Sequence, residues 1–385
     1  MKTYLILTPY NTFNEKNNMD QHELKILLNK HNYKEVSYKD VLDKKYNHID
    51  FIYYNVSLNK HYDKSIFSIS SVLYTRFLNY ILDKDTLYNE FQDIIKNNKE
   101  FHKKDIINYA NQLTDKSVNI HDIKSYNDLK QIYKTDTFII KPSKGFKGLG
   151  ISIVTNNNDL QQYKECIKTK LKSCNIIKYN DKNKNFLLKI LNNTINIYPY
   201  YKDIILFDNK KFHVRLYLLI KYTPKNNGIY YSYFDMLKIM TAKDPYKKSD
   251  YTNENIHDTH FNSTDNDYYL FIDDYKENNK YNSKHINISE DNFNSLNLQI
   301  KILSYLVYLI FVKMIKNKIL YKDDHAQNIV EIFGLDLLIT DKYQIKVLEI
   351  NNKLGYAVKN QNNKIVKLFN KRFFQWYFDN IEDII

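Results

Sequence analysis

The stretch FGLDLLITDKYQIKVLEINN, residues 333–352, decides how this chain is expected to fold. It consists of two β-forming runs joined by a polar turn, so Asp336 on the first run can face Glu349 and Asn351 on a neighbouring strand. Residues two apart on a strand share a face, which places Glu349 beside Asn351. The three side chains would form an all-oxygen site of the kind that Mg²⁺ prefers. The alternative is an edge strand whose carboxylates are simply exposed to solvent.

Glycine is scarce in the chain and is concentrated in two regions, one at 145–150 and the other at Gly334 and Gly355, which flank the stretch 335–354. Only 6 glycines occur, where average composition would give about 27. The stretch KPSKGFKGLGI, residues 141–151, supplies Lys141, Gly145, Lys147, Gly148 and Gly150. Glycine lets backbone N–H groups approach an anion, so this loop is predicted to cover phosphates, with a plain glycine-rich turn as the alternative. The residue order excludes a Walker loop, and a β run follows instead of a helix, which excludes a dinucleotide fingerprint.

Outward from these two stretches, the chain is predicted to be an α/β (α+β) protein of three parts. The predicted β runs are 4–7, 34–37, 51–56, 137–141, 151–154, 193–198, 214–222, 229–239, 329–340 and 344–351, and the predicted helices are 20–30, 159–171 and 296–319, with helical periodicity also over 76–113. The predicted domains are a small α/β domain at 1–95, a central domain at 96–196 and a C-terminal domain at 197–385, which contains a polar insertion at 242–292.

The charge balance favours acidic partners. The chain has 57 basic and 44 acidic residues, a formal net charge of +13, which suits nucleic acid, an anionic membrane face or an acidic polypeptide. Aromatic residues are spread along the whole chain instead of forming one stripe, so a nucleic-acid surface is not favoured. The apolar stretch 300–315 is interrupted by two lysines and has helical spacing, which predicts a buried core helix and no membrane span.

Cysteine and histidine offer only weak signals. The two cysteines, Cys166 and Cys174, are too few for a disulfide framework and fit no metal-ligand pattern. We therefore expect inert thiols in a reducing, cytoplasmic compartment. Two polar groups could be read as metal ligands, namely His257 with Asp258 and His260, and Asp323 with Asp324 and His325. Neither group has the spacing of a hydrolase motif, so solvated loops are the expected interpretation.

Arginine is as scarce as glycine. Arg76, Arg215 and Arg372 are the only three in the chain. Lysine cannot replace a planar bidentate donor without loss, so an arginine kept at position 215, within KFHVRLY at 211–217, indicates a functional role. The alternative is a surface salt bridge.

Five motifs, in the same order, resemble the tubulin tyrosine ligase-like family of ATP-grasp ligases. They are the 141–151 loop, KFHVRLY at 211–217, LKIMTAKDPY at 237–246, HDTH at 257–260 and the stretch at 333–351. An upstream KKD at 103–105 resembles the family's Arg-Lys-Asp element. The resemblance covers about residues 101–352, and it implies an ATP-grasp fold that holds ATP between the central and C-terminal domains.

The resemblance also implies roles for individual residues. The implied magnesium ligands are Asp336, Glu349 and Asn351, and the implied catalytic residues are Arg215, Lys238 and Glu349. The residues implied to bind ATP are Lys104, Lys141, Gly145, Lys147, Gly148, Gly150, Tyr200, Tyr201, Lys211, His213 and Thr259. Among them, Tyr200 and Tyr201 belong to a segment that looks like the family's interdomain hinge, which binds adenine through its backbone.

The implied reaction transfers the γ-phosphate of ATP to a carboxylate, and the amine of an amino acid then attacks the acyl-phosphate to form an amide bond. ATP and Mg²⁺ are the implied cofactors, and a free amino acid is one implied substrate. The other is an acidic protein, such as one with a Glu-rich or tubulin-like C-terminal tail, which lysine-rich segments such as 364–372 would hold.

The chain departs from the family pattern on the acceptor side. His213 stands where the family usually has Asp, Lys238 where it usually has Arg, and Asp258-Thr259-His260 where it has Leu-Thr-Asn. Two alternatives therefore stay open. One is a protein that keeps the fold but has lost ligation and uses its basic face for nucleic acid or a cytoskeletal partner. The other is a ligase that acts on a small-molecule carboxylate.

Overall fold

The computed structural model of the protein describes most of its residues. They are residues 2–7, 26, 28–37, 40, 43, 45–46, 48–54, 68–73, 84–143, 150–172, 184–192, 194–224, 228–251, 253–259, 268–317, 328–351 and 364–381. Several predicted features lie outside these residues, including Gly145, Lys147, Gly148, Cys174, His260, the Asp323 group and most of the predicted helix at 20–30.

The described elements are strands and helices in mixed order. In the first half they are β1 (Lys2–Leu7), β2 (Tyr33–Glu35), β3 (His48–Tyr54), β4 (Ser68–Leu73), α4 (Lys84–Asn97), the 3-10 helix η4 (Lys99–His102), α5 (Lys104–Gln112), β5 (Val118–Asn119), the 3-10 helix η5 (Ile120–Asp122), α6 (Tyr126–Tyr133), β6 (Phe138–Pro142), β7 (Ser152–Val154), α7 (Asn157–Lys168), α8 (Lys184–Leu191) and β8 (Ile195–Pro199). In the second half they are β9 (Phe212–Thr223), β10 (Gly228–Tyr233), β11 (Met236–Thr241), α9 (Glu254–His257), β12 (Tyr268–Phe271), α10 (Tyr275–Asn282), α11 (Glu290–Lys316), β13 (Asn328–Ile339), β14 (Ile345–Asn351) and α12 (Lys364–Ile381).

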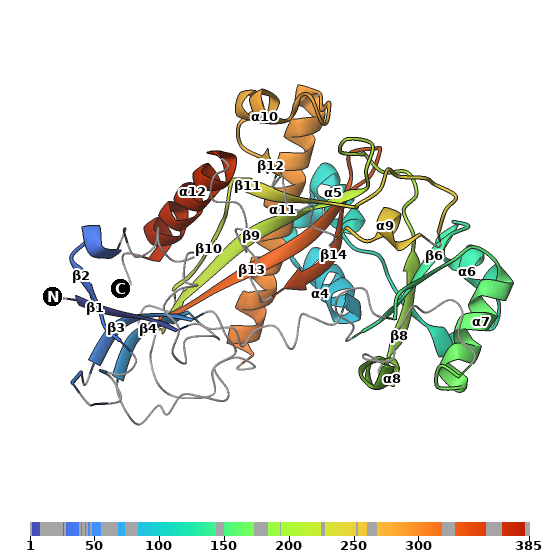
Figure 1. Ribbon diagram of the computed structural model, residues 1–385, viewed down its shortest axis with the longest axis horizontal. Coiled ribbons are helices and arrows are strands. Elements are labelled where there is room, and N and C mark those ends of the chain that lie inside the picture. The colour runs from blue at the N-terminus through green and yellow to red at the C-terminus, as the bar shows by residue number, and fades with distance from the viewer. Residues whose placement is uncertain are drawn as a thin grey trace.

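A mixed ten-stranded sheet forms the body of the molecule. Its strand order is β12-β11-β9-β13-β4-β3-β1-β2, with β10 paired to β9 and β14 paired to β13. β9 and β13 run antiparallel at its centre, and β4 joins β13 in parallel orientation. The N-terminal strands therefore continue the same sheet, at the end of the molecule where Figure 1 shows the blue strands. The predicted domain boundaries stay a prediction.

The alternation of side chains along β9 gives this sheet two different faces. Val214, Leu216 and Leu218 point to one face, where they join the large core under α11. Tyr217 and Leu219 point to the other face and join a second core with α12. A strand buried on both faces reads as a nearly continuous apolar run, and β9 is buried from Phe212 through Lys221. The polar residues within such a strand need a specific reason to be there.

The face packed by α12 is apolar over only part of its length. Phe369 and Phe373 of α12 lie 5.8 and 5.2 Å, ring centre to ring centre, from Tyr217. Arg215 lies two residues before Tyr217, on the same face of β9. The aromatic cover supplied by α12 therefore ends where the charged residues of the sheet begin, which places the C-terminal helix beside the candidate site.

A second, smaller sheet lies at the other end of the molecule (Figure 1). Its four strands are antiparallel in the order β5-β8-β6-β7, and α6, α7 and α8 pack on it around buried residues such as Phe138, Ile140 and Leu160. β6 pairs with β7, with Phe138 opposite Val154, so the predicted hairpin around the glycine loop is confirmed. The two sheets together make the protein a mixed α+β fold.

One sequence expectation about elements is wrong, and a second segment contains more structure than its composition indicated. The predicted strand at 229–239 is two strands, β10 and β11, separated at Phe234 and Asp235. The predicted insertion at 242–292 contains β12, which extends the large sheet, as well as α9, α10 and the start of α11. Sequence reasoning also missed α12, because the segment 364–372 was interpreted only through its lysines, as a surface that holds an acidic tail.

Helix α11 is, among the described residues, the one helix long and apolar enough to cross a membrane. Just over half, 56%, of its most apolar window is buried inside the fold. Leu303, Leu306 and Ile310 are fully buried in the core beneath β9 and β13. These contacts confirm the predicted core helix.

Cys166 differs from its expected state. It is buried on α7 and is disulfide-bonded, so the expected inert thiol is wrong at this position. The expected compartment stays a prediction.

Candidate active site on the large sheet

A row of four charged residues crosses the large sheet, and we call it the charged row. Strand register places Lys238 of β11 opposite Arg215 of β9, and Arg215 opposite Asp336 of β13. The same register places Asp336 opposite Glu349 of β14. Directly opposed residues on neighbouring strands point to one face of a sheet, so the four side chains lie side by side. Lys238, Arg215 and Asp336 are buried, and Glu349 is half-buried.

Arg215 and Asp336 form a bidentate ion pair at the centre of the charged row. Nε of Arg215 donates to Oδ1 of Asp336 at 2.7 Å, and Nη2 donates to Oδ2 at 2.9 Å. Burial by itself would lower the pKa of Arg215, but hydrogen bonding to Asp336 outweighs it, and the pKa is raised above its ordinary value. Arg215 therefore stays charged, and its pair is a buried one instead of the surface salt bridge considered as an alternative.

Asn351 joins the two carboxylates of the charged row. Its Nδ2 donates to Oδ2 of Asp336 at 3.1 Å and to Oε1 of Glu349 at 2.9 Å. One electropositive group thus lies between two carboxylates that would otherwise repel each other. The amide contributes an oxygen as well, so the set offers three hard oxygen donors on adjacent strands, which is chemistry that fits Mg²⁺.

The predicted magnesium set depends on that amide. Among the described residues, no group of three or more His, Cys, Asp or Glu side chains lies close enough to hold a metal ion. The set of Asp336, Glu349 and Asn351 has only two carboxylates, and Asn351 has to turn its oxygen inward to complete it. Their role as ligands stays a prediction.

His213 adjoins the charged row on the same face of β9. Its side chain is 1% exposed, and Nε2 lies 3.8 Å from Oδ2 of Asp336. Nδ1 hydrogen-bonds with Oγ1 of Thr259, which is also buried. An imidazole at this position adds no fixed negative charge beside Asp336, in contrast to the aspartate that the resemblance leads one to expect. His213 and Thr259, both expected near a nucleotide, are thus brought together at the charged row.

Lys211 begins a directed chain of hydrogen bonds that ends in the loop after β11. Its ammonium can only donate, so Nζ donates to Oη of Tyr200 at 3.0 Å, and Tyr200 then donates to Nδ1 of His257 at 2.7 Å. Nε2 of His257 donates to the backbone oxygen of Asp250, which can only accept. Burial lowers the pKa of His257, which favours the neutral imidazole that this arrangement requires.

Burial also makes Lys211 an unusual cation. Its side chain is 9% exposed, and Nζ lies 4.6 Å from the centre of the Tyr200 ring. Burial lowers the pKa of Lys211 to about 8, while the charge of Asp258 acts in the opposite direction. A buried ammonium that has given up hydration gains strongly from an anion, so Lys211 is suited to a phosphate.

The segment after β8 connects the two sheets and carries Tyr200 and Tyr201. The backbone N–H of Tyr200 donates to the oxygen of Thr137 beside β6. Oη of Tyr201 donates to Asp115 at 2.6 Å, and Lys346 of β14 pairs with the same carboxylate at 3.1 Å. These contacts attach the connecting segment to the small sheet on one side and to the large sheet on the other, as expected of a hinge.

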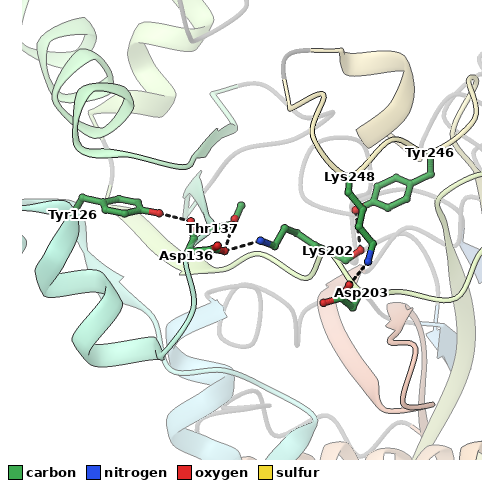
Figure 2. Close-up of polar contacts among 7 residues, drawn as sticks. All are labelled: Tyr126, Asp136, Thr137, Lys202, Asp203, Tyr246 and Lys248. Carbon is green, nitrogen blue, oxygen red and sulfur yellow. Dashed lines mark hydrogen bonds and ion pairs between the residues drawn. The ribbon is translucent and has the colours of Figure 1, made fainter.

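Figure 2 shows how the residues after Tyr201 are held. Lys202 reaches the small-sheet side, where Nζ bonds Oδ1 of Asp136 at 2.6 Å. From the other side, Oη of Tyr246 donates to the backbone oxygen of Lys202 at 3.0 Å, and Lys248 pairs with Asp203. The segment between β11 and β12 therefore holds the connecting segment in place. It supplies the Tyr246 and Lys248 contacts as well as the contact of His257 with Tyr200.

The glycine-loop residues are only partly described. Lys141 lies at the end of β6 opposite Asn196 of β8, with Nζ 5.9 Å from the Tyr198 ring. Gly150, which ends the loop, has a φ of +78°, a value that residues with a side chain rarely adopt. A Cβ at this position would also lie only 2.7 Å from Cγ of Pro142. The fold thus requires glycine at position 150 for its backbone, and any contact of the loop with phosphate stays a prediction.

Lys104 is a predicted site residue that the structure places on a different element, α5. It is the exposed first residue of α5, a helix that packs through Ala110 and Leu113 into the core beneath α11. That core lies on the opposite face of the large sheet from the charged row. The described contacts therefore do not join Lys104 to the other candidate residues.

Sequence reasoning assigned no role to three residues that hold the site together. His257 was set aside as part of a polar loop, yet it accepts the hydrogen bond from Tyr200. Asp115 links the connecting segment to β14. Gly334 lies against Arg215. The scarcity of glycine in this chain was the one sequence signal that pointed to this position.

A mixed α+β protein with two sheets, a clasped connecting segment and a row of cations and carboxylates is consistent with a nucleotide-dependent ligase. The model of the tubulin-tyrosine ligase family matches residues 60–370 of the chain. The protein therefore belongs to the tubulin-tyrosine ligase family, whose members are ATP-grasp ligases. No curated protein sequence gives a significant match to the chain.

Proposed function

We propose that the protein is an ATP- and magnesium-dependent ligase of the ATP-grasp fold that joins an amino acid to a protein carboxylate through an amide bond. The charged row carries this proposal, because it places a buried arginine and two carboxylates on adjacent strands within the region that matches the family. A set of largely buried charges on a central sheet has a high desolvation cost, which a binding function explains better than stability does.

The residues of the chain divide the reaction between them. Asp336, Glu349 and Asn351 would hold magnesium, which when bound neutralises phosphate charge. Lys211 and Lys141 would hold the phosphates of ATP, and the backbone of the connecting segment at Tyr200 and Tyr201 would hold the adenine. Lys211 is oriented toward that role by the chain through Tyr200 and His257.

Arg215 would act at the reacting carboxylate. The acceptor carboxylate takes the γ-phosphate of ATP to form an acyl-phosphate and release ADP, and the amine then attacks the carbonyl carbon, loses a proton and expels phosphate. Negative charge develops on the carbonyl oxygen during that attack, and a fixed guanidinium stabilises it without reorganisation. Lys238, directly beside Arg215, would add a second positive charge at the acceptor end of the charged row.

The exposed side of α12 supports a proposal for the acceptor. Lys364, Lys367 and Lys371 are exposed at helical spacing, whereas Arg372 is paired with Asp235. Because α12 packs beside the charged row, a flexible acidic tail bound along these lysines would reach the site. Arg372, which was expected to share this task, is already engaged within the fold.

One experiment tests the proposed function. The protein is incubated with ATP, magnesium and labelled amino acids against polyglutamate, tubulin and small free carboxylates, and transfer of label is measured. Label on a polypeptide acceptor supports the proposal, and Arg215→Lys is the matched variant, since it keeps the charge but loses the fork to Asp336.

A non-catalytic protein is the second candidate, and the structure at His213 favours keeping it. A buried histidine replaces the expected carboxylate 3.8 Å from Asp336. In that case ATP binds, but no acceptor of any class gains label. Label on a small carboxylate alone would instead identify a small-molecule ligase.

A further inference from the structure

Gly334 lies directly against the side chain of Arg215. It is on β13 two residues before Asp336, and strand register places it opposite Tyr217 of β9 and Asn351 of β14. A Cβ at position 334 would come within 3.1 Å of Cδ and 3.5 Å of Nε of Arg215. Its three nearest neighbours would all be Arg215 atoms.

The glycine at this position provides space and not backbone freedom. Among the described glycines, only Gly150 has a positive φ, so other residues could adopt the backbone conformation of Gly334. Carbon atoms prefer to lie about 3.5–4.0 Å apart, so a Cβ at 3.1 Å from Cδ would push the arginine away from the strand. Arg215 lies across the bare backbone of Gly334, and from there its fork reaches both oxygens of Asp336.

We propose that Gly334 is the positioning residue that fixes Arg215 in the charged row, an inference that rests on the proposed function for the catalytic part of its consequence. The side-chain stem of Arg215, from Cγ to Nε, can lie this close to β13 only where no side chain intervenes. A methyl group at position 334 displaces the guanidinium, which loosens its pairing with Asp336 and moves its charge relative to the reacting carboxylate.

A double-mutant cycle on unfolding tests the positioning without any substrate. Gly334→Ala should lower the Tm of the wild-type protein, because the methyl group meets Arg215. In an Arg215→Ala background the same change should leave the Tm unchanged or raise it, because the space is open and alanine restricts the unfolded chain more than glycine does. An equal fall in both backgrounds would overturn the inference.

Arg215→Ala leaves Asp336 buried without its partner, so a second background guards against a variant that does not fold. Arg215→Ala with Asp336→Asn removes both charges, and Gly334→Ala should again cause no fall in Tm there. A fall of the same size as in the wild type would contradict the role of Arg215 as the neighbour that is displaced.

Turnover separates this inference from the proposed function. Gly334→Ala should lower kcat by up to about tenfold with little change in ATP affinity, because Arg215 must shift by a few tenths of an ångström and catalysis is sensitive to the position of the catalytic group. If kcat is unchanged although Gly334→Ala lowers the Tm only in the presence of Arg215, the catalytic consequence is overturned. If the wild-type protein ligates no acceptor, the proposed function fails while the Tm cycle still decides the positioning.

Discussion

Lys211 is a residue through which pH should act on folding stability. Its pKa is lowered by burial to about 8 in the folded protein, from an ordinary value of 10.5. Below pH 8 both folded and unfolded states carry the charge, so the cost of burying it is fully present. Between pH 8 and 10.5 the unfolded state binds more protons, so stability rises with pH, and above 10.5 the cost is gone.

Replacing Lys211 should therefore stabilise the protein in a pH-dependent way. Lys211→Met is expected to raise the free energy of unfolding by about 1–3 kcal/mol at pH 7, and the gain should shrink as pH rises from 8 to 10.5. Chemical denaturation across this pH range measures it, with Lys276→Met on the exposed side of α10 as the control. A gain that does not vary with pH would show that the lysine is not buried as a cation.

Replacing Glu349 should impair the reaction without lowering the stability of the fold. Glu349→Gln keeps an oxygen that accepts from Nδ2 of Asn351, so β14 should stay in register while the site loses one negative charge. Magnesium-dependent ATP turnover should fall by at least about tenfold with an unchanged Tm. Glu165→Gln, an exposed carboxylate on α7, is the control. Normal turnover in Glu349→Gln would remove this carboxylate from the mechanism.

At the level of elements, the β13–β14 hairpin is fixed to α11 by one buried amide. Gln299 is fully buried, its Oε1 accepts from the N–H of Ile345 at 2.8 Å, and its Nε2 donates to the oxygen of Tyr343 at 2.8 Å. The helix thereby supplies hydrogen bonds to the turn that precedes β14, the strand that carries Glu349 and Asn351.

Gln299→Leu should leave a buried N–H and a buried C=O without these partners. The expected loss is about 2–4 kcal/mol of unfolding free energy, because each orphaned group costs its desolvation. Denaturant titration measures it, and Gln375→Leu on the exposed side of α12 should cost less than about 0.5 kcal/mol. Similar values for the two variants would mean that Gln299 does not hold the turn.

The elements show which parts of the structure the sequence could predict. The β13–β14 pair and the hairpin around the glycine loop were predictable, because strand alternation and turn residues are local signals. The pairing of Arg215 with Asp336 in the charged row was not, because the two residues are 121 positions apart and meet only through strand register. α12 was missed although Phe369, Phe373 and Tyr377 recur at helical spacing, because the lysines between them drew attention to charge.

At the level of the whole molecule, the net charge is +13, and we expect the lysines along α12 to form the part of the positive surface that binds the acceptor. Replacing Lys364, Lys367 and Lys371 together by Gln should weaken binding of an acidic peptide and leave ATP affinity unchanged, since glutamine preserves helix propensity. Peptide binding should also weaken steeply with salt, because the Debye length falls from about 10 Å at 0.1 M to about 3 Å at 1 M. Fluorescence anisotropy with a labelled polyglutamate peptide measures both effects.

The control for that surface is a second triple variant with the same change of charge. Lys124, Lys130 and Lys168 are exposed and lie on or beside α6 and α7, on the side of the molecule away from α12 (Figure 1), so their replacement by Gln should alter peptide binding much less. Equal weakening in the two triple variants would mean that the whole positive field, and not α12, attracts the acceptor.

The central claim is that the charged row is a magnesium-nucleotide site. A crystal structure of the protein with magnesium and a non-hydrolysable ATP analogue tests it most directly. The account predicts a metal ion about 2.1 Å from oxygens of Asp336, Glu349 and Asn351, with the phosphates next to Lys211 and Arg215 beside the terminal phosphate. Nucleotide bound elsewhere, or a charged row that keeps its ion pair and amide bridge with no metal at saturating magnesium, would contradict it.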